Sequence, residues 1–388
     1  MKTSDARPTV RKPRVLIIEN SVDVTGAATS ITRSCEILRD SFEFLFILPS
    51  NSMAVDMVQR KGFEVVTFPM KEIRKKTWAL IQYIPFLLIN AWRLHKLIRK
   101  EKIDLVVNND FYNLIPVLCR FLPGRRIPYV CFVRFLPSKF PARLVRLWCG
   151  LHSRYASGII AVSEAVRREL PVEGKVEVIY NQLPAEETVY EPASSTVILY
   201  PSNYIKGKGH EYALESFVRI ADRYPAWNLM FVGSDMGLKK NKDFKTALIR
   251  RAHDLGLQDR VEWRGSVQYM GPLYRQAGLV LNFSESESFS LTCLEALFHG
   301  RPLVATDCGG PAEIIDAPET GLLVPVGDVD AMTQAIDSLL ADAPRREEMG
   351  RKAYVAVRNK FSDQTTVRAL GEIFTRSIGI KSPTFNNR

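Results

Sequence analysis

The stretch LVLNFSESESFSLTCLEALFHG, residues 279–300, contains the pattern that decides the fold. A short apolar run is followed by a loop-like segment of small polar residues and then by a run long enough for a helix. The apolar run LVLNF has the length of a strand and no polar alternation, which is typical of a parallel strand that is buried on both faces. The run LTCLEALFHG predicts a helix that ends at Gly300. A strand that leads into a helix is the unit of open α/β sheets.

The same alternation of strand, loop and helix continues on both sides of this stretch. Strands are predicted at VLIIE (15–19), EFLFIL (43–48), EVVTF (64–68), DLVVN (104–108), PYVCF (128–132) and GIIAV (158–162), and, in a second series, at TVILY (196–200), LMFVG (229–233), RVEWRG (260–265), LVLNF (279–283), PLVAT (302–306) and GLLVP (321–325). The segments between them are long enough for crossover helices. We therefore expect an α/β protein with two Rossmann-like parallel-sheet domains.

The length of 388 residues suits two domains of common size. The Pro-rich and acidic stretch 181–195 predicts the linker. We expect an N-terminal domain at 1–190 and a C-terminal domain at 191–361, with a last helix at about 362–380 that packs back on the first domain. Facing open sheets bind ligands at the carboxyl ends of their strands, so the strand-end loops are the places to look for chemistry.

Composition and charge narrow the classes of partner. Lys and Arg outnumber Asp and Glu by 53 to 42, and the net charge of +11 favours phosphorylated small molecules, acidic membrane surfaces or nucleic acid. The charge is dispersed and no nucleic-acid-binding module is present, so we expect no nucleic-acid partner. The cysteines form no C-x-x-C pair and the first residues contain no separate apolar leader, which favours a reducing cytoplasm.

An apolar stretch flanked by lysines and arginines lies at 71–102, KEIRKKTWALIQYIPFLLINAWRLHKLIRKEK. Its apolar centre, Trp78 to Trp92, is shorter than the roughly 20 residues that span a bilayer, so a transmembrane helix is not expected. Two interpretations stay open. The segment is either an interfacial helix that holds the protein at the inner face of the cytoplasmic membrane, or a helix pair that covers the sheet and has a solvated basic end.

Several common sites are disfavoured. The histidines have no metal-ligand spacing, so no metal is expected, and no G-x-G-x-x-G or G-K-[ST] loop is present. Asp328 and Asp330 could hold a divalent ion, but they precede a helix-like run and are better explained as an N-cap and a first-turn acid.

The strand-end loops of both predicted domains contain a different set of polar groups. The free N–H groups at the start of the helix after 284–290 would attract phosphate, and Lys206 and Lys208 follow the strand at 196–200. From the other domain, the small residues around Gly26 let the backbone approach a ligand closely. Together they predict a diphosphate pocket with the carboxylates of Glu287 and Glu295 nearby.

Simpler roles exist for each residue alone. Thr292 with Glu295, and Ser284 with Glu287, both have the spacing of a helix capping box. Lysines such as Lys206 are mostly solvated surface residues.

The combination resembles a known family. ESFSLTCLEALFHGRPLVATDCGGPAEII (287–315) is similar to the E-x7-E region of family 4 retaining glycosyltransferases of the GT-B fold, in which two Rossmann-like domains face a central cleft. The resemblance covers most of the chain, since further stretches follow in the family's order: GIIAVSEAVRREL (158–170), VIYNQLP (178–184), KGHEYALESF (208–217), LMFVG (229–233), DRVEWRGSV (259–267), TGLLVPVGD (320–328) and RREEMGRKAYVAVRNKFS (345–362).

This resemblance implies a role for each matching residue. Glu287 would contact sugar hydroxyls of a nucleotide-sugar donor, and Glu295 would accept hydrogen bonds from the ribose. Lys208 and the backbone of Ser288, Phe289, Ser290 and Leu291 would hold the diphosphate. Gly26 would lie near the donor phosphate and the acceptor, and the base and sugar would be bordered by Gly233, Arg264 and Gly265.

The resemblance also implies metal-independent transfer of a hexose or related sugar with retention, from a donor such as a UDP- or GDP-sugar, without a further cofactor. The acceptor would be a glycan or a lipid-linked glycan of cell-surface polysaccharide or lipopolysaccharide synthesis. Two positions depart from the family pattern. Asn203 stands where the family usually has Arg, with Lys206 as the nearest replacement for that charge, and both would be donor-binding residues. Arg134 is the nearest match to a common His and would be a catalytic residue, together with Glu287 and Lys208, on the acceptor side or the phosphate side. A non-catalytic nucleotide- or glycan-binding protein and a nucleotide-sugar epimerase of the same fold are the alternatives.

Overall fold

The structure is a computed structural model that describes residues 11–70, 77–172, 174–184, 188–192, 195–267 and 269–380. Its first sheet has the order β3-β2-β1-β4-β5-β6-β7, and its second has the order β10-β9-β8-β11-β12-β13. The strands of the first sheet are β1 (Arg14–Ile18), β2 (Glu43–Pro49), β3 (Glu64–Phe68), β4 (Leu105–Asn108), β5 (Tyr129–Val133), β6 (Gly158–Ala161) and β7 (Val176–Val178). Those of the second are β8 (Val197–Pro201), β9 (Asn228–Val232), β10 (Val261–Arg264), β11 (Leu279–Asn282), β12 (Leu303–Thr306) and β13 (Leu322–Val324).

Helices cover both sheets. Around the first sheet lie α1 (Gly26–Leu38), α2 (Ala54–Arg60), α3 (Thr77–Lys100), α4 (Ile115–Cys119), the 3-10 helix η1 (Pro137–Lys139), α5 (Ala142–Tyr155) and α6 (Glu164–Glu169). Around the second lie α7 (His210–Val218), α8 (Lys239–Asp254), α9 (Gly271–Gln276), α10 (Leu291–Phe298), α11 (Pro311–Ile314), α12 (Val329–Leu340) and α13 (Ala343–Lys360), and the chain ends in α14 (Asp363–Ile378). Below, the N-terminal half means the described residues up to 184, and the C-terminal half means 188–361.

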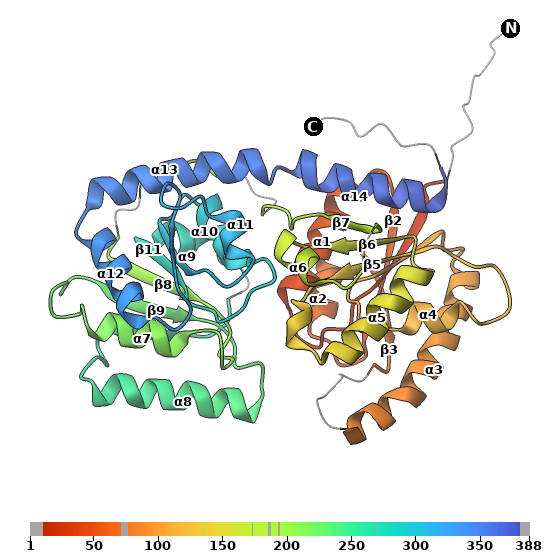
Figure 1. Cartoon of the computed structure of the whole chain (residues 1–388), viewed down its shortest axis with the longest axis horizontal. Helices are drawn as coiled ribbons and strands as arrows, with labels where there is room; N and C mark the ends of the chain where they lie inside the picture. Colours follow the sequence, from red (N-terminus) through yellow and green to blue (C-terminus); the bar gives the residue numbers. More distant parts are fainter. Residues whose placement is uncertain are drawn as a thin grey trace, which may run out of the picture.

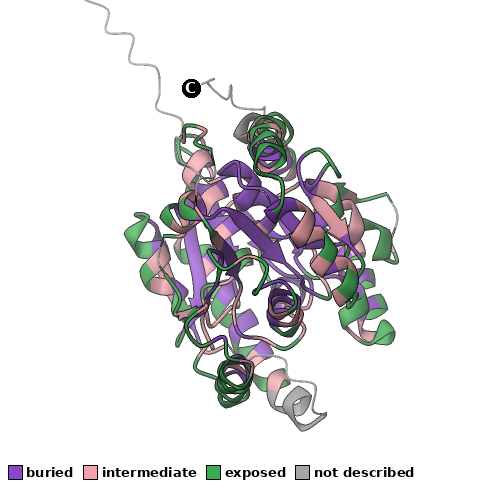
Figure 2. Ribbon diagram, turned by 90° about the vertical axis from the view of Figure 1, so that its left-hand side faces the viewer, coloured by how far each residue is buried: buried purple, intermediate pink, exposed green. Residues whose placement is uncertain are grey.

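Each predicted strand is confirmed, and the pairs are parallel, as in the register Val15 opposite Phe44 and Leu105. Strand β1 shows why the apolar runs were informative: Val15 to Ile18 are completely buried, because helices lie on both faces of the sheet. Figure 2 shows the strands buried inside and the helices exposed on their outer sides. The edge strand β7 was not predicted, because its three residues are only partly buried and include Glu177.

The strand orders place a switch point in each sheet. From β1 the chain continues to β2 on one side, whereas from β4 it continues to β5 on the other, and β8 and β11 diverge in the same way in the second sheet. The loops that follow such a strand pair lead apart and leave a crevice at its carboxyl edge. The two crevices thus place the loops after β1 and β4 and those after β8 and β11 where a ligand can reach them.

The C-terminal helices connect the two halves. Figure 1 shows α13 above the second sheet and α14 above the first. The ring of Phe374 on α14 meets the ring of Phe42 edge to face with 5.7 Å between centroids. Between the halves, Tyr180 lies 5.7 Å from the Phe289 ring and 5.3 Å from the Phe361 ring. An apolar layer therefore continues from one half into the other.

The stretch 71–102 forms one helix, α3, from Thr77 onward, rather than a helix pair, and residues 71–76 lie outside the described residues. Its inner face buries Leu87, Ala91, Leu94 and Ile98. Within the described ranges, no helix has the length and apolar character needed to cross a membrane.

Candidate active site

A cavity of about 520 Å³ lies between the two halves and is lined by residues from both. The N-terminal half contributes loops after β1, β4, β5 and β7, and the C-terminal half contributes loops after β8, β9, β10 and β11. These include the loops at both switch points. Its volume is in the range of pockets that bind small molecules.

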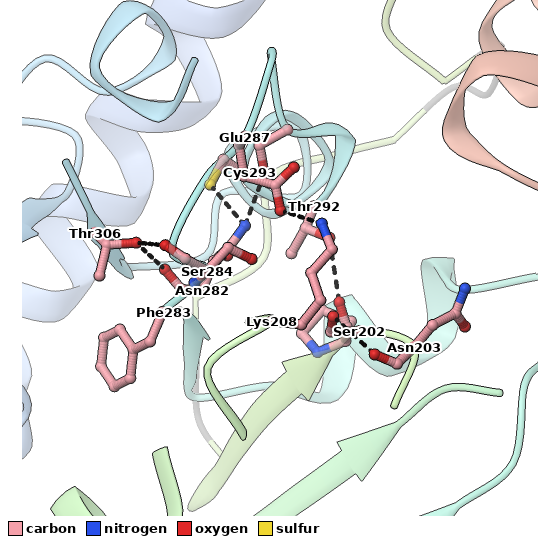
Figure 3. A network of polar contacts seen from close by, with 12 residues as sticks. Ser202, Asn203, Lys208, Asn282, Phe283, Ser284, Glu287, Thr292, Cys293 and Thr306 are labelled. Carbon is pink, nitrogen blue, oxygen red and sulfur yellow. Dashed lines mark hydrogen bonds and ion pairs between the residues drawn. The ribbon is translucent and has the colours of Figure 1, made fainter. Parts of the chain in front are cut away.

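Lys208 and Glu287 form an ion pair in the wall of this cavity. The Nζ atom of Lys208 donates to Oε1 of Glu287 at 2.7 Å, and their side chains are 30% and 17% exposed (Figure 3). Burial lowers the pKa of Lys208, but the carboxylate of Glu287 raises it by charge attraction and hydrogen bonding, and the net change in the pKa is upward. The lysine is therefore cationic at neutral pH and balances the charge of Glu287.

The loop before α10 is tightly built. Ser290 has a φ of 89° and is the N-cap of α10, and its Oγ accepts from the N–H of Cys293 at 3.3 Å and from Nδ2 of Asn282 at 2.8 Å. A Cβ at Gly310 would lie 2.2 Å from the Cα of Phe289, so only glycine allows this close approach. Ser288, Phe289, Ser290 and Leu291 all line the cavity.

The capping boxes that the spacing suggested do not form as expected. Ser290, not Thr292, caps α10, and the hydroxyl of Thr292 donates to the carbonyl of Pro201 at 3.2 Å. The predicted stop at Gly300 is confirmed, since this residue follows α10 with a φ of 64°. The N-cap role of Asp328 is also confirmed, because its carboxylate accepts from the N–H of Ala331 at 2.9 Å.

Glu295 lies one turn into α10 and also lines the cavity. Its Oε1 accepts from Nη2 of Arg33 at 2.8 Å, and this arginine belongs to α1 of the opposite half. A second neighbour is Tyr274, whose hydroxyl donates to the carbonyl oxygen of Thr292 at 3.5 Å; burial, then the negative charge of Glu295, raises the pKa of Tyr274. The carboxylate of Glu295 is thus paired with a cation from the opposite half of the chain.

The remaining cavity residues of the predicted site come from three loops. Gly26 begins α1 and faces Leu291, whose Cδ1 would be 3.3 Å from a Cβ at this glycine. Asn203 turns its side chain toward the next loop, where Oδ1 accepts from the N–H of Ser234 at 2.9 Å. Gly233 allows a close backbone approach, since a Cβ there would lie 2.0 Å from the carbonyl oxygen of Ser202.

Three residues of the predicted site lie outside the cavity lining. Lys206 is exposed, and Arg264 forms an ion pair with Glu262. Gly265 is exposed as well, but the next residue, Ser266, lines the cavity. Lys206 therefore does not supply, in this arrangement, the charge that Asn203 lacks.

Arg134 is buried in the N-terminal wall and holds several loops together. Its Nε and Nη2 donate to Oδ1 of Asn109 at 3.0 and 2.8 Å, and Nη1 donates to Oδ1 of Asn181 at 2.8 Å. Burial lowers the pKa of Arg134 to about 10, while the nearby carboxylates of Glu19 and Asp110 act in the opposite direction. Its guanidinium stays charged at neutral pH, and most of its N–H groups are engaged by neutral amides.

Two further residues of the site were not predicted. Asp110 follows β4, lines the cavity and is almost fully buried, and its pKa is raised by burial and by the charge of Glu19. A signal for Asp110 existed, because the polar pair Asn109-Asp110 follows the strand at 104–108. Arg33 had no comparable signal, since it lies inside a helix. Among the described residues, no three His, Cys, Asp or Glu side chains form a group that could hold a metal ion.

Each half of the chain matches the model of a known protein family. Residues 24–187 match the family model described as Glycosyltransferase Family 4, and residues 186–356 match the one described as Glycosyl transferases group 1. The N-acetyl-alpha-D-glucosaminyl L-malate synthase of Bacillus anthracis is 25% identical over 328 residues, 78% of this chain and 82% of that protein. The lipopolysaccharide core biosynthesis mannosyltransferase LpsB of Rhizobium meliloti is 28% identical over 169 residues, 43% of this chain and 48% of that protein. Several further curated relatives also match over only about half of their own length or less.

Solved structures share the architecture. The crystal structure of Anabaena HepE in complex with UDP and glucose superposes with a TM-score of 0.79 at 20% identity and covers 93% of this chain and 99% of that one. The family matches run from residue 24 to residue 356, and the two parallel sheets have the same arrangement as in these structures. The chain therefore belongs to the glycosyltransferases of the GT-B fold, with a Glycosyltransferase Family 4 region followed by a group 1 region.

Proposed function

We propose that this protein is a retaining glycosyltransferase that moves a sugar from a nucleoside-diphosphate sugar to a glycan or lipid-linked acceptor. The observation that carries the proposal is the arrangement of Glu287 and Glu295 in one cavity on either side of the first turn of α10, with Lys208 bound to Glu287. Two carboxylates suit hydroxyl groups, while a lysine and helix N–H groups suit a diphosphate. HepE, the fold relative, is described in complex with UDP and glucose, which supports a donor of this class.

We assign the roles accordingly. Glu287 accepts hydrogen bonds from hydroxyls of the transferred sugar, and Glu295 accepts them from the ribose. Lys208 and the N–H groups of residues 288–291 stabilise the charge that builds on the departing diphosphate. A well-aimed donor of this kind stabilises the transition state by about 3 to 4 kcal/mol. Because Lys208 is paired with Glu287, it can serve the phosphate without leaving an unbalanced carboxylate in the wall.

The configuration at the anomeric carbon is retained because the acceptor attacks the same face of the sugar that the diphosphate leaves. The departing phosphate oxygen takes the proton of the acceptor hydroxyl, so the reaction proceeds without a second catalytic carboxylate. The bond from the sugar carbon to phosphate breaks as the bond to the acceptor oxygen forms. The protein then acts mainly by orientation of the two reactants and by charge stabilisation.

The acceptor side is assigned to the N-terminal half, where Gly26 and Arg134 line the cavity. We place the two domains at 1–190 and 191–361, with α14 on the first. The similarity to LpsB, a lipopolysaccharide core biosynthesis mannosyltransferase, supports a place in cell-surface polysaccharide or lipopolysaccharide synthesis. We also propose that the protein acts in the cytoplasm, at the inner face of the cytoplasmic membrane.

We further propose that α3 makes peripheral contact with the membrane. Its outer side exposes Ile84, Leu88 and Trp92, which are spaced four residues apart and are each more than half exposed. Nζ of Lys96 lies 3.6 Å from the centroid of the Trp92 ring. Apolar side chains beside basic ones fit the interface of an anionic bilayer.

Release of nucleoside diphosphate from UDP-, GDP- and ADP-sugars, with and without glycan acceptors, tests the function. We expect release with one donor class and a loss of kcat/KM of roughly a hundredfold in Glu287→Gln and Lys208→Met. Glu285→Gln is the matched control, because Glu285 lies two residues away but is exposed and outside the cavity lining.

Three outcomes would change the assignment. Full activity in Glu295→Ala would refute the ribose site. Donor binding without turnover, with every acceptor tried, would favour the non-catalytic alternative, for which the amide of Asn203 in place of a cation is the relevant feature. Conversion of the donor sugar without an acceptor would identify an epimerase.

A further inference from the structure

Arg33 is the residue outside the cavity lining that acts most directly on the candidate site. Its Nη2 donates to Oε1 of Glu295 at 2.8 Å, and the two side chains are only 19% and 16% exposed. Glu295 faces the cavity, whereas Arg33 approaches the carboxylate from α1, in the opposite half. Arg33 is thus placed to control Glu295 rather than to line the cavity itself.

The contact is part of a helix pair that crosses between the halves. Gly26 and Arg33 lie seven residues apart on α1, and Leu291 and Glu295 lie four apart on α10, so each pair lies on one face of its helix. Gly26 meets Leu291 at the cavity end, and Arg33 meets Glu295 further along. The two helices therefore meet at two points, one at the cavity and one at the ion pair.

The position of Arg33 is unfavourable for one of its N–H groups. Its Nη1 is buried and has no hydrogen-bond partner among the described residues. An unsatisfied buried N–H group is unfavourable, so the ion pair with Glu295 must offset it. A surface arginine that paired with Glu295 incidentally would keep this nitrogen in water.

We propose that Arg33 is a positioning residue for nucleotide recognition, which orients Glu295 toward the ribose and makes the ribose contact depend on closure of the two halves. The inference rests on the proposed function, in which Glu295 binds ribose hydroxyls. Arg33 holds one carboxylate oxygen and leaves the other for the ligand. When the halves separate, Glu295 loses this cation and its fixed orientation, so tight binding of the nucleotide requires the closed arrangement.

A simpler role for Arg33 would be to hold the two halves together. A second contact between the halves provides the control for this role: the carboxylate of Glu313, in α11, accepts from the N–H groups of Glu164 and Ala165 at 2.8 and 2.5 Å. Glu313 lies outside the cavity lining. Loss of this contact should affect closure without affecting Glu295.

Calorimetric binding of nucleotides separates these roles. UDP, GDP and ADP are first tested on the wild type, and the tightest of them is compared with its 2′-deoxy and 3′-deoxy analogues and with pyrophosphate, which has no ribose. We expect one deoxy analogue to bind the wild type about tenfold more weakly, since a hydrogen bond to a charged group is lost.

The Arg33 and Glu313 variants are expected to differ in their preference for the ribose hydroxyl. In Arg33→Ala we expect the parent nucleotide to weaken by about tenfold and the preference over the deoxy analogue to disappear, with pyrophosphate affinity unchanged. Arg33→Lys should restore part of the preference, because lysine keeps the charge but not the planar fork. Glu313→Gln should keep the wild-type preference. Thermal melting of each variant confirms that it is folded.

Each contrary result has a distinct meaning. An unchanged preference for the ribose hydroxyl in Arg33→Ala overturns the inference. Equal weakening of nucleotide and pyrophosphate in Arg33→Ala, matched by Glu313→Gln, also overturns it and assigns Arg33 to closure alone. A wild-type protein that binds none of UDP, GDP and ADP overturns the proposed function, and the inference with it.

Discussion

At the scale of single residues, the ion pair of Lys208 and Glu287 explains how a carboxylate can lie beside the proposed diphosphate site. An unpaired Glu287 would repel the phosphates, whereas the ion pair presents a nearly neutral wall. The upward shift in the pKa of Lys208 keeps that cation present throughout the physiological pH range. The pair thus supports both the hydroxyl-binding and the phosphate-binding roles.

His152 provides a residue-scale prediction on stability. Its Nε2 lies 2.7 Å from the carbonyl oxygen of Phe111 and its Nδ1 3.1 Å from the hydroxyl of Tyr129, and burial lowers its pKa from 6.5 to about 4. Between these two values the unfolded chain binds a proton that the folded chain does not. The free energy of unfolding should therefore be constant above pH 6.5 and fall toward pH 4, by up to about 1.4 kcal/mol per pH unit.

Urea unfolding at several pH values measures this slope. His152→Gln should flatten the decline between pH 6.5 and 4, and His253→Gln, at an exposed position on α8, should leave it as in the wild type. A decline that is equally steep in His152→Gln would show that other groups cause it. His210, whose pKa burial also lowers to about 4, is expected to account for part of the remaining slope.

The residues of the site differ in how well sequence alone indicates them. Glu287, Glu295 and Lys208 follow strands in a recognisable spacing, and all three line the cavity. Arg33 is one arginine within an amphipathic helix, and its importance comes only from the residue that it meets across the halves. Sequence spacing suggested Thr292 as one possible cap of α10, but Ser290 is the N-cap and adopts a φ of 89°, a conformation that spacing does not reveal.

At the scale of elements, apolar runs in the sequence predicted the strands correctly, because parallel strands are buried on both faces. The runs of β1 and β11 are completely enclosed or nearly so, and their composition shows it. Strand β7 is at an edge and is partly solvated, so its short and polar sequence carries no such signal. Helix α3 is the opposite case, since its sequence is apolar on both sides although only one side is buried.

The outer side of α3 leads to an element-scale prediction. Vesicles of phosphatidylglycerol should bind the wild-type protein in a flotation assay, and vesicles of phosphatidylcholine should bind it weakly, because anionic lipids attract the basic residues by about 1 kcal/mol each. Leu88→Asp and Trp92→Asp should abolish most of the binding, since both side chains are exposed and would have to enter the interface.

Ile249→Asp is the control for that experiment. Ile249 is an exposed apolar residue of α8, in the other half of the protein, so its replacement changes charge and hydrophobicity to a similar extent elsewhere. Binding that is lost in all three variants would indicate a general effect of charge. Binding that survives in the α3 variants would refute the membrane contact of this helix.

At the scale of the whole molecule, the helix α14 packs against the first sheet, although it follows the second sheet in the chain. Val367, Leu370, Ile373 and Phe374 of α14 are buried, and Phe374 packs on Phe42, which precedes β2. The first sheet is therefore stabilised by residues that follow the second sheet in the chain. This arrangement links the stability of the two halves.

Phe374→Ala should lower the free energy of unfolding of the N-terminal half by about 3 to 5 kcal/mol, because the substitution removes a fully buried ring. Val355→Ala, at an exposed position on α13, is the matched control and should have little effect. Urea unfolding followed by tryptophan fluorescence measures both. A loss in Phe374→Ala no larger than in the control would contradict the proposed packing role of α14.

The sequence by itself determined the class of fold and the number of sheets, and most of the site residues that it indicated do line the cavity. It could do so because buried parallel strands require apolar runs and because ligand groups follow those strands. Only the tertiary structure decided which groups meet between the halves: Arg33 with Glu295, Glu313 with the start of α6, and Lys206 outside the cavity. Such contacts depend on how two separately folded sheets are placed against each other, and no local spacing in the chain encodes that placement.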